Sequence, residues 1–428
     1  MTLAFRGSPA HTLGIELEVG IVDDGSDELA CWAPEILAEA SADASRPGLA
    51  RIKRELFEST LELVTDVCRT PAEARADLAA TVAHLAPALR ARNLSLISCG
   101  VHPFSSWEPV RVTGEDRYLR MVERFQWPVR RLTIYGVHYH VGVPTGHHAM
   151  ATMNGLTRLL PHLLALSASS PFWYGRDTGL ASVRTRLWES VPSAGVPPRL
   201  DDWSEFVRLV SLLKGTGTIE TTHDLWWDVR PSPMLGTVEL RICDSMSSLA
   251  QVCALAALAQ AAVAHICDGV DRGEIPVREP DWVLRENKWR ASRFGLSAEM
   301  VHSDGTVVPL VDEVLEWVDR VRPAARALGG EPDLDRVLDL LAAAPSYARQ
   351  RDVIDRGGTL RDVVALLRRE FAANAAAPDA SAANVARSRP REVSAGGSEP
   401  RERRPGGRTG DVPSPRGSRR RASAQRDQ

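Results

Sequence analysis

Four short stretches of the sequence carry ionisable side chains at alternate positions. These side chains are Glu16 and Glu18 in "GIELEVG", Glu58 and Glu62 in "LFESTLELV", His138 and His140 in "GVHYHVGV", and Glu239 and Arg241 in "TVELRIC". The positions between them are mostly apolar, which is the alternation of a β-strand with one polar and one buried face. Each stretch therefore predicts a strand that presents its ionisable groups on one side.

A solvated face of an antiparallel sheet is an ordinary explanation for any one of these strands. Exposed faces usually mix Thr, Lys, Ser and Arg, however, whereas the polar faces of these four stretches carry no lysine. Carboxylates gathered on one face raise each other's pKa unless a cation lies among them. Several carboxylates with one or two imidazoles and no thiolate suit Mg²⁺, or Mn²⁺, better than a structural zinc. We therefore expect a site for a hard divalent cation.

An arginine beside such a site favours nucleotide phosphates as the ligand. Metal ions bridge phosphate oxygens, while a guanidinium such as that of Arg241 stabilises charge on the transferring phosphoryl group. No glycine-rich loop supports ATP binding independently, because "LKGTGTIE" lacks the GK[ST] of a P-loop and no GxGxxG follows a predicted strand. A nucleotide would therefore be held by metals and scattered arginines.

Helices separate the predicted strands without an internal repeat. Thr70, Pro71 and Glu73 form a capping box at the start of a helix that runs to about Arg92. Other expected elements are a strand over 93–100, helices over 151–170, over 247–268, over about 311–328 and in "DDWSEFVRLVSLL", and a strand pair in "WWDVRPSP" and "GTVELRICD". The apolar run "LAQVCALAALAQAAVAHIC" is interrupted by polar residues and predicts a buried helix rather than a membrane span. The first residues, "MTLAFRGSPAHTLG", lack the apolar core of a signal peptide.

Composition divides the chain of 428 residues at about position 374. Residues 374–428 contain no aromatic residue and twelve Arg against six Asp or Glu, so they predict a disordered basic tail after a folded domain of residues 1–373. The net charge of −3 for the whole chain leaves −9 for residues 1–373, which excludes general attraction of the folded domain to nucleic acid. Six cysteines without a CxxC pair indicate reduced thiols in a cytoplasmic protein.

Six motifs, in this order along residues 11 to about 370, resemble those of the bacterial carboxylate-amine ligases of the type-2 glutamate-cysteine ligase family. They are "HTLGIELEVGIVD", "LFESTLELVTDVCR", "GVHYHVGV", "SASSPFWYGRDTGLASVR", "WWDVRPSP" with "GTVELRICD", and "ENKWRASRFGL". The resemblance implies an α+β, glutamine-synthetase-like fold, in which a curved and mainly antiparallel sheet carries helices on its outer face. It also implies that the concave face holds Mg²⁺ and ATP.

The reaction implied by this resemblance is ATP-dependent joining of a carboxylic acid to an amine through an acyl phosphate. In glutamate-cysteine ligases the acid is glutamate and the amine is cysteine. Two alternatives use the same face: an amino-acid or guanidino phosphotransferase, and a non-catalytic sensor of nucleotides or amino acids. The partners are then small molecules, with no membrane, and a homodimer is a reasonable assembly for such an enzyme.

The resemblance also assigns roles to individual residues by position. Those similar to the family's metal ligands are Glu16, Glu18, Glu58 or Glu62, His138 and Glu239, and Arg241 is similar to the arginine that steadies the phosphoryl group. His140 is either a metal ligand or a hydrogen-bonding neighbour of one. Arg230 and Arg184 are either clamps for a carboxylate or phosphate, because a planar guanidinium suits both anions, or members of structural salt bridges. Asn287 and Arg290 are expected to anchor the cofactor site.

Overall fold

The computed structural model describes residues 3–8, 11–42 and 52–376. The last helix, α14 (Leu360–Ala376), ends three residues beyond the predicted domain of residues 1–373. The rest of the predicted tail lies outside the described residues.

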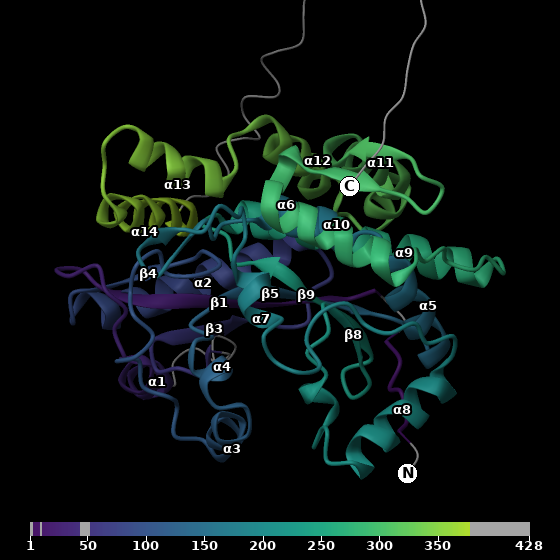
Figure 1. The fold of residues 1–428 in the computed structure, drawn as a ribbon, viewed down its shortest axis with the longest axis horizontal. Helices are drawn as coiled ribbons and strands as arrows, with labels where there is room; N and C mark the ends of the chain where they lie inside the picture. Colours follow the sequence, from purple (N-terminus) through teal and green to yellow (C-terminus); the bar gives the residue numbers. More distant parts are fainter. Residues whose placement is uncertain (1–2, 9–10, 43–51, 377–428) are drawn as a thin grey trace, which may run out of the picture. The chain divides into compact units, whose positions relative to one another are not determined.

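A seven-stranded antiparallel sheet forms the centre of the protein (Figure 1). Its strands are β1 (Leu13–Asp23), β2 (Ile52–Arg54), β3 (Thr60–Val64), β4 (Leu94–Ile97), β5 (Gly136–Gly142), β8 (Val229–Ser232) and β9 (Thr237–Asp244). Their order is β2-β3-β1-β5-β9-β8, and β4 pairs with the second half of β1. Two small hairpins stand apart: β6 (Phe172–Trp173) with β7 (Arg176–Asp177), and β10 (Glu299–Val301) with β11 (Val307–Pro309).

Fourteen α-helices connect and cover these strands in the described part of the chain. The first seven are α1 (Ala33–Ala42), α2 (Pro71–Arg90), α3 (Asp116–Phe125), α4 (Trp127–Arg130), α5 (Gly146–Leu156), α6 (Leu160–Ser167) and α7 (Arg184–Trp188). The others, besides α14, are α8 (Trp203–Gly215), α9 (Leu249–Asp271), α10 (Asp281–Phe294), α11 (Leu310–Ala327), α12 (Glu331–Ala342) and α13 (Ser346–Asp355). Two short 3₁₀ turns span Thr222–Asp224 and Gly295–Ser297.

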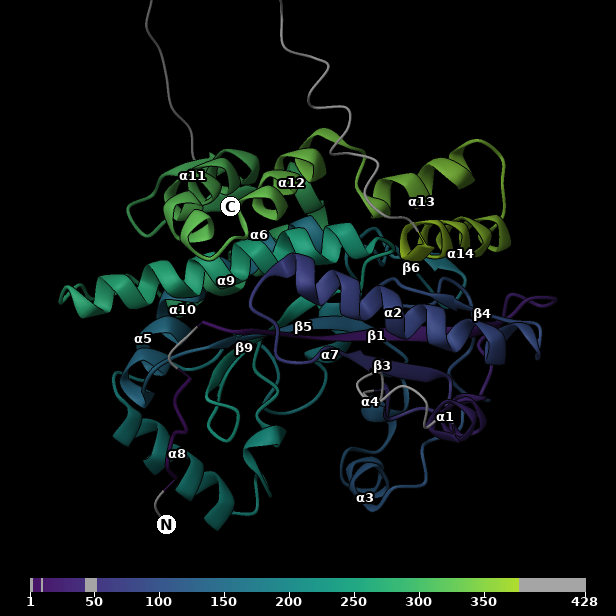
Figure 2. The same cartoon turned by 180° about the vertical axis from the view of Figure 1, so that it is seen from behind.

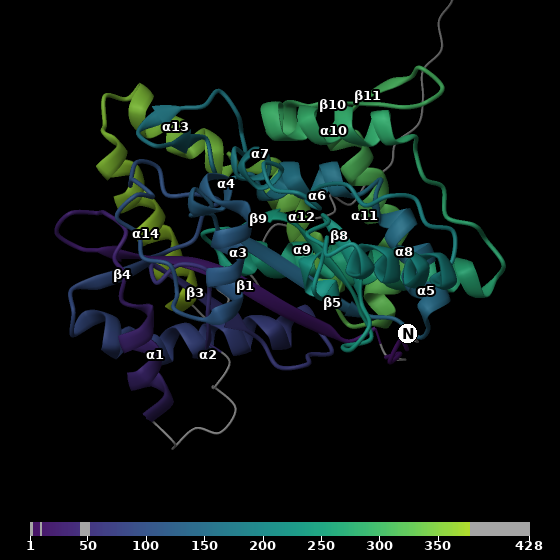
Figure 3. The ribbon, with the colours of Figure 1, turned by 60° about the horizontal axis from the view of Figure 1, so that its bottom comes forward.

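The two faces of the sheet have opposite surroundings. On one side, α2, α9, α11 and α12 lie over the strands, as both Figure 1 and Figure 2 show. The alternate apolar residues of β1 and β5, such as Ile15, Leu17 and Tyr139, are fully buried in the core that these helices complete. On the other side, α3, α4 and α8 lie in front of the strands in Figure 3. The ionisable residues of the strands point to this second side, and that is where the site forms.

Helix α9 supplies much of the core. Its length and composition would allow it to cross a membrane, but 83% of its apolar window is buried inside the protein. The alanines along this helix let it pack closely against the sheet and against α11 and α12. The buried helix predicted from the sequence is therefore present, and it is slightly longer than predicted.

Local signals in the sequence set several element boundaries. At the start of α2, the Thr70 hydroxyl accepts a hydrogen bond from the Glu73 amide, as the capping motif predicts, whereas the Glu73 carboxylate accepts from the amide of Arg69. The helix predicted over 151–170 is instead two helices, α5 and α6. Pro161 lies in the first turn of α6, where a missing amide hydrogen costs nothing, and it could not continue α5.

Candidate active site

A cavity of about 240 Å³ opens on the polar face of the sheet. Its acidic lining consists of Glu16, Glu18, Glu55, Glu62 and Glu239, and its basic lining of Lys53, Arg54, Arg117, Arg184, Arg230 and Arg241 with His138, His140 and His223. One wall is apolar and comes from Tyr118, Met121, Leu132, Ile134, Trp188 and Trp226. Within it, Trp188 packs on Trp226 with ring centroids 5.5 Å apart and donates its indole hydrogen to the Trp226 carbonyl.

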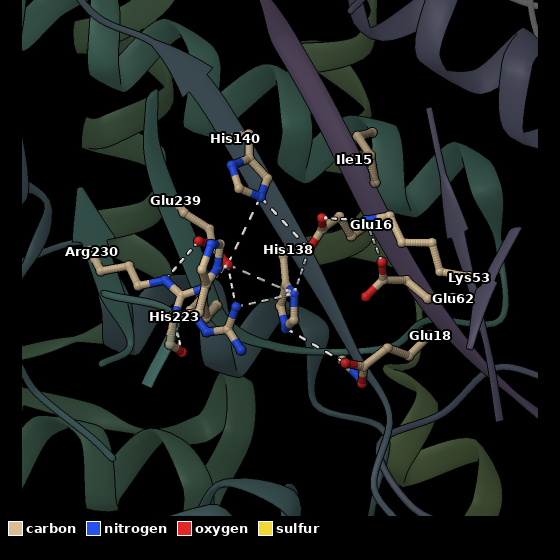
Figure 4. Close-up of polar contacts among 12 residues, drawn as sticks. Ile15, Glu16, Glu18, Lys53, Glu62, His138, His140, His223, Arg230 and Glu239 are labelled. Carbon is tan, nitrogen blue, oxygen red and sulfur yellow. Dashed lines mark hydrogen bonds and ion pairs between the residues drawn. The ribbon is translucent and has the colours of Figure 1, made fainter. Parts of the chain in front are cut away.

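Strand register brings the predicted side chains together across the sheet. Glu16 lies opposite His138 and Glu18 lies opposite Glu62, while His140 and Arg230 both lie opposite Glu239. Opposite residues of an antiparallel pair have neighbouring side chains on one face, so these pairs converge without any loop rearrangement. Figure 4 shows the result, with His138 between Glu239 on one side and Glu16 and Glu18 on the other.

The first acidic group consists of Glu16, His138 and Glu239, and one ligand atom of each lies within 4.8 Å of the others. His138 Nδ1 is 3.3 Å from Glu16 Oε2 and 4.0 Å from Glu239 Oε1. His140 Nε2 is 3.7 Å from Glu16 Oε2 and 3.8 Å from Glu239 Oε1, and this buried nitrogen has no hydrogen-bond partner among the described residues. An unpartnered buried imidazole nitrogen beside two carboxylates fits an additional metal ligand.

Positive neighbours dominate the electrostatics of this first group. Burial alone would raise the pKa of Glu239, but the guanidiniums of Arg230 and Arg241 hold it well below its usual range. Burial also opposes ionisation of Glu16, yet its contacts with the neighbouring His138 and His140 lower its pKa. Burial, with the charge of Arg241, lowers the pKa of His138 to about 4, so that this imidazole is neutral and free to bind a metal.

The second acidic group consists of Glu18, Glu55 and Glu62, whose ligand atoms also lie within 4.8 Å of one another. Glu18 Oε2 accepts a hydrogen bond of 2.5 Å from the amide of Gly136. Burial raises the pKa of both Glu18 and Glu55 to about 7, and burial with the charges of Glu16 and Glu55 raises the pKa of Glu62 well above its usual range. Three crowded carboxylates of this kind fit a hard divalent cation, whose charge would offset their repulsion.

Arg230 does not have a free guanidinium. It donates to both oxygens of Glu239, at 2.8 and 3.2 Å, and to the carbonyls of His223 and Leu225. Arg230 is therefore a member of a salt bridge, the second of the two roles considered for it, and its bonds orient Glu239 toward the histidines. Arg241 also pairs with Glu239 and reaches His138 Nδ1 at 3.5 Å, so it lies at the centre of the first group.

Arg184 lines the cavity but is almost wholly buried. It donates to the carbonyl of Ile242 at 3.2 Å, and its Nε has no hydrogen-bond partner among the described residues. The guanidinium occupies space that is free only because residue 136 is glycine, since a Cβ there would overlap it. Arg184 therefore holds the backbone of strand β9, and its charge offsets part of the effect of burial on the pKa of Glu18.

Three residues predicted for the site lie outside the cavity. Glu58 precedes β3, which begins only at Thr60, and its carboxylate pairs with Arg111 at 2.5 Å. Asn287 on α10 exchanges two hydrogen bonds with the backbone of Val301. Arg290 pairs with Glu286 on the same helix. The prediction that Glu58 lies on a strand face is wrong because the chain turns between Phe57 and Thr60. Helix α10 directs Asn287 to the backbone of β10 and Arg290 to Glu286, so neither side chain lines the cavity.

The cavity also contains residues that sequence reasoning missed. Glu55 takes the place expected for Glu58, and Lys53, Arg54, Arg117 and His223 add positive or titratable groups. The motif "KRELFEST" places Lys53, Arg54 and Glu55 a few residues before Glu58, but alternation cannot be followed through a turn. Arg117 and His223 come from α3 and from a 3₁₀ turn, where no alternating pattern marks them.

Comparison with known proteins identifies the family. The model of glutamate-cysteine ligase family 2 (GCS2) matches residues 12–365. A protein of Frankia casuarinae with the provisional name glutamate–cysteine ligase 2-1 is 44% identical over 373 residues, which cover 87% of this chain and 98% of the relative. A Thermobifida fusca protein with the provisional name glutamate–cysteine ligase 2 is 41% identical over 382 residues, which cover 89% and 96%.

A solved structure supports the fold. The crystal structure of glutamate–cysteine ligase from Francisella tularensis in complex with AMP superposes with a TM-score of 0.63 over 87% of this chain and 90% of that chain, at 15% identity. This likeness concerns the fold alone, and it agrees with the α+β architecture of an antiparallel sheet with helices. The family indicated by the sequence motifs is thus confirmed: the chain belongs to glutamate-cysteine ligase family 2 and is an ATP-dependent ligase of that type.

Proposed function

We propose that this protein joins a small carboxylic acid to an amine through an acyl phosphate, at the expense of ATP, with glutamate and cysteine as the first candidates for the two substrates. The observation that carries this proposal is the pair of acidic groups in one cavity, with Arg241 beside Glu239 and His138 of the first group. A kinase-like or ligase reaction on ATP needs charge neutralisation around the phosphates, and this cavity contains the residue types for it.

The two acidic groups would hold Mg²⁺, with Mn²⁺ as a substitute. The first group would bind through Glu16, His138 and Glu239, with His140 as a further ligand, and the second through Glu18, Glu55 and Glu62. When bound, the ions would neutralise phosphate charge and orient the γ-phosphoryl group. Arg241 would then offset the charge that develops on the transferring phosphoryl group.

The proposed reaction has two displacement steps. A carboxylate oxygen of the acid attacks the γ-phosphorus of ATP, a new P–O bond forms, and the bond to ADP breaks. The amine nitrogen then attacks the acyl carbon, the C–O bond to phosphate breaks, and the amine loses a proton as phosphate leaves. The protein supplies orientation and electrostatic stabilisation, because neither step requires a nucleophile from a side chain.

Arg54 and Arg117 are the better candidates for binding the anionic groups of the substrates. Both line the cavity, and neither has an ion-pair partner among the described residues, in contrast to Arg230. An unpaired guanidinium can give a carboxylate or phosphate two parallel hydrogen bonds. All six cysteines are free thiols, which supports action in the reducing cytoplasm.

The test is phosphate release from ATP by the full chain, with Mg²⁺, glutamate and a panel of amines that includes cysteine. We expect release only when acid and amine are both present, an equal amount of amide by mass spectrometry, and no release from Arg241→Ala. A phosphorylated acid that accumulates without amine would identify a phosphotransferase instead. Nucleotide binding without turnover by any pair would favour a sensor.

A further inference from the structure

Lys53 reaches into the cavity from β2, the edge strand of the sheet, and contacts both acidic groups (Figure 4). Its Nζ lies 2.9 Å from Glu62 Oε1 and 3.3 Å from Glu16 Oε1. Strand pairing sets Lys53 opposite Glu62, while Glu16 lies on the next strand inward. A single ammonium therefore bridges the second group, through Glu62, and the first group, through Glu16.

The oxygens that Lys53 occupies are ones that a metal would also need. Glu16 Oε2 contacts the two histidines and Glu16 Oε1 contacts the Lys53 ammonium, so only one of the two carboxylate oxygens is free of the lysine. A divalent cation bound by either group would lie close to the Lys53 ammonium, and the two positive charges would repel one another. The ammonium and the metal cannot share these carboxylates without loss to both.

A lysine at position 53 suits ion pairs that must break when a metal ion binds. The chain has 52 lysine and arginine residues, and only three of them are lysines. Lys288, the buried one, is fixed between Asp228 and Glu189 at 2.5 and 2.7 Å, whereas the Lys53 side chain is 52% exposed. A compact ammonium on a flexible stem returns to water more readily than a guanidinium held by two parallel bonds.

We propose that Lys53 is a built-in competitor of the divalent cation, which balances Glu16 and Glu62 in the metal-free protein and moves out toward solvent when metal binds. This inference rests on the metal site of the proposed function. The strength of the Lys53 contacts then sets the metal concentration at which the site fills. In the metal-free protein, the ammonium also reduces the repulsion among the carboxylates of Glu16, Glu18, Glu55 and Glu62.

The experiment is a Mn²⁺ titration of the full chain without nucleotide, followed by electron paramagnetic resonance of the free ion. Lys53→Met removes the charge but keeps the apolar stem, and we expect it to bind Mn²⁺ about fivefold more tightly than the unmodified protein. Lys53→Arg should bind Mn²⁺ no more tightly than the unmodified protein, because the guanidinium holds the carboxylates more firmly. Lys214→Met, with the same charge change in the last turn of α8, is the matched control and should bind as the unmodified protein does.

A second readout is thermal unfolding with and without Mn²⁺. The melting temperature of metal-free Lys53→Met should fall, and its rise on metal addition should exceed that of the unmodified protein. Lys53→Gln, a second neutral variant, should repeat both results. Equal or weaker Mn²⁺ binding by the two neutral variants would overturn the inference while leaving the metal site intact. Absence of Mn²⁺ binding by the unmodified protein would overturn both, so the two failures are distinguishable.

Discussion

The two acidic groups share one face of one sheet, yet the protein balances their charges differently. In the first, Glu239 lies against Arg230 and Arg241, and its pKa stays well below the usual range. In the second, burial raises the pKa of Glu18 and Glu55 to about 7, and among the described residues Lys53 is the only lysine or arginine in an ion pair with this group. The fold gives the first group two arginines, whereas the three carboxylates of the second group have one partly exposed lysine. Metal should therefore stabilise the second group more.

Glu239→Gln should have the largest effect, because it takes a shared negative charge from two buried guanidiniums. We expect the free energy of unfolding to fall by about 3 kcal/mol. Phosphate release should fall about a thousandfold, because the position and charge of Arg241 both change. Urea unfolding followed by circular dichroism measures the first effect and a phosphate assay the second. Unchanged stability would mean that the fold does not depend on this charge balance.

Glu55→Gln tests the second group and should affect stability in a different way. It removes one of three crowded carboxylates, so the metal-free protein should keep its free energy of unfolding within about 1 kcal/mol or gain stability. Phosphate release should still fall about a hundredfold, because a proposed metal ligand is lost. The rise in melting temperature on Mn²⁺ addition should shrink. A stability loss as large as that of Glu239→Gln would remove the contrast between the groups.

Gly136→Ala tests the close contact between residue 136 and the Arg184 side chain that lines the cavity. The added methyl would overlap the Arg184 guanidinium, which must then leave the carbonyl of Ile242. We expect a loss of about 2 kcal/mol in the free energy of unfolding, measured in urea. Gly14→Ala on β1 is the control, because its methyl would meet the His140 side chain at an ordinary 3.6 Å. Equal stability of the two variants would contradict a role for this close contact.

Arg290→Ala should have the smallest effect, since this residue lies outside the cavity. Its partners are Glu286, one helical turn away and partly exposed, and the backbone carbonyl of Glu299, at 3.3 Å. Because both contacts lie at the surface, the free energy of unfolding should change by less than about 0.5 kcal/mol. Phosphate release should stay within about twofold of the unmodified protein, because no group near the cavity moves. A large loss of turnover at normal stability would return Arg290 to the site.

Alternation along the strands predicted seven of the 14 acidic and basic residues that line the cavity. Alternation identified Glu16, His138 and Glu239 as members of one face because side-chain direction in a strand depends only on position along the chain. The cap at Thr70 and the buried helix α9 were predictable for a similar reason, since each depends on neighbouring residues. Prediction failed at Glu58 because a turn interrupts the alternation there.

The sequence by itself therefore determined which strands have a polar face and which family the motifs resemble, and it predicted a hard divalent cation for that face. Only the tertiary structure decided how those faces combine. In the folded protein, Glu55 and Lys53 line the cavity, Arg230 pairs with Glu239, and Glu58 pairs with Arg111. The physical reason is that alternation is local, whereas strand register and ion-pair partners depend on pairing between segments far apart in the chain.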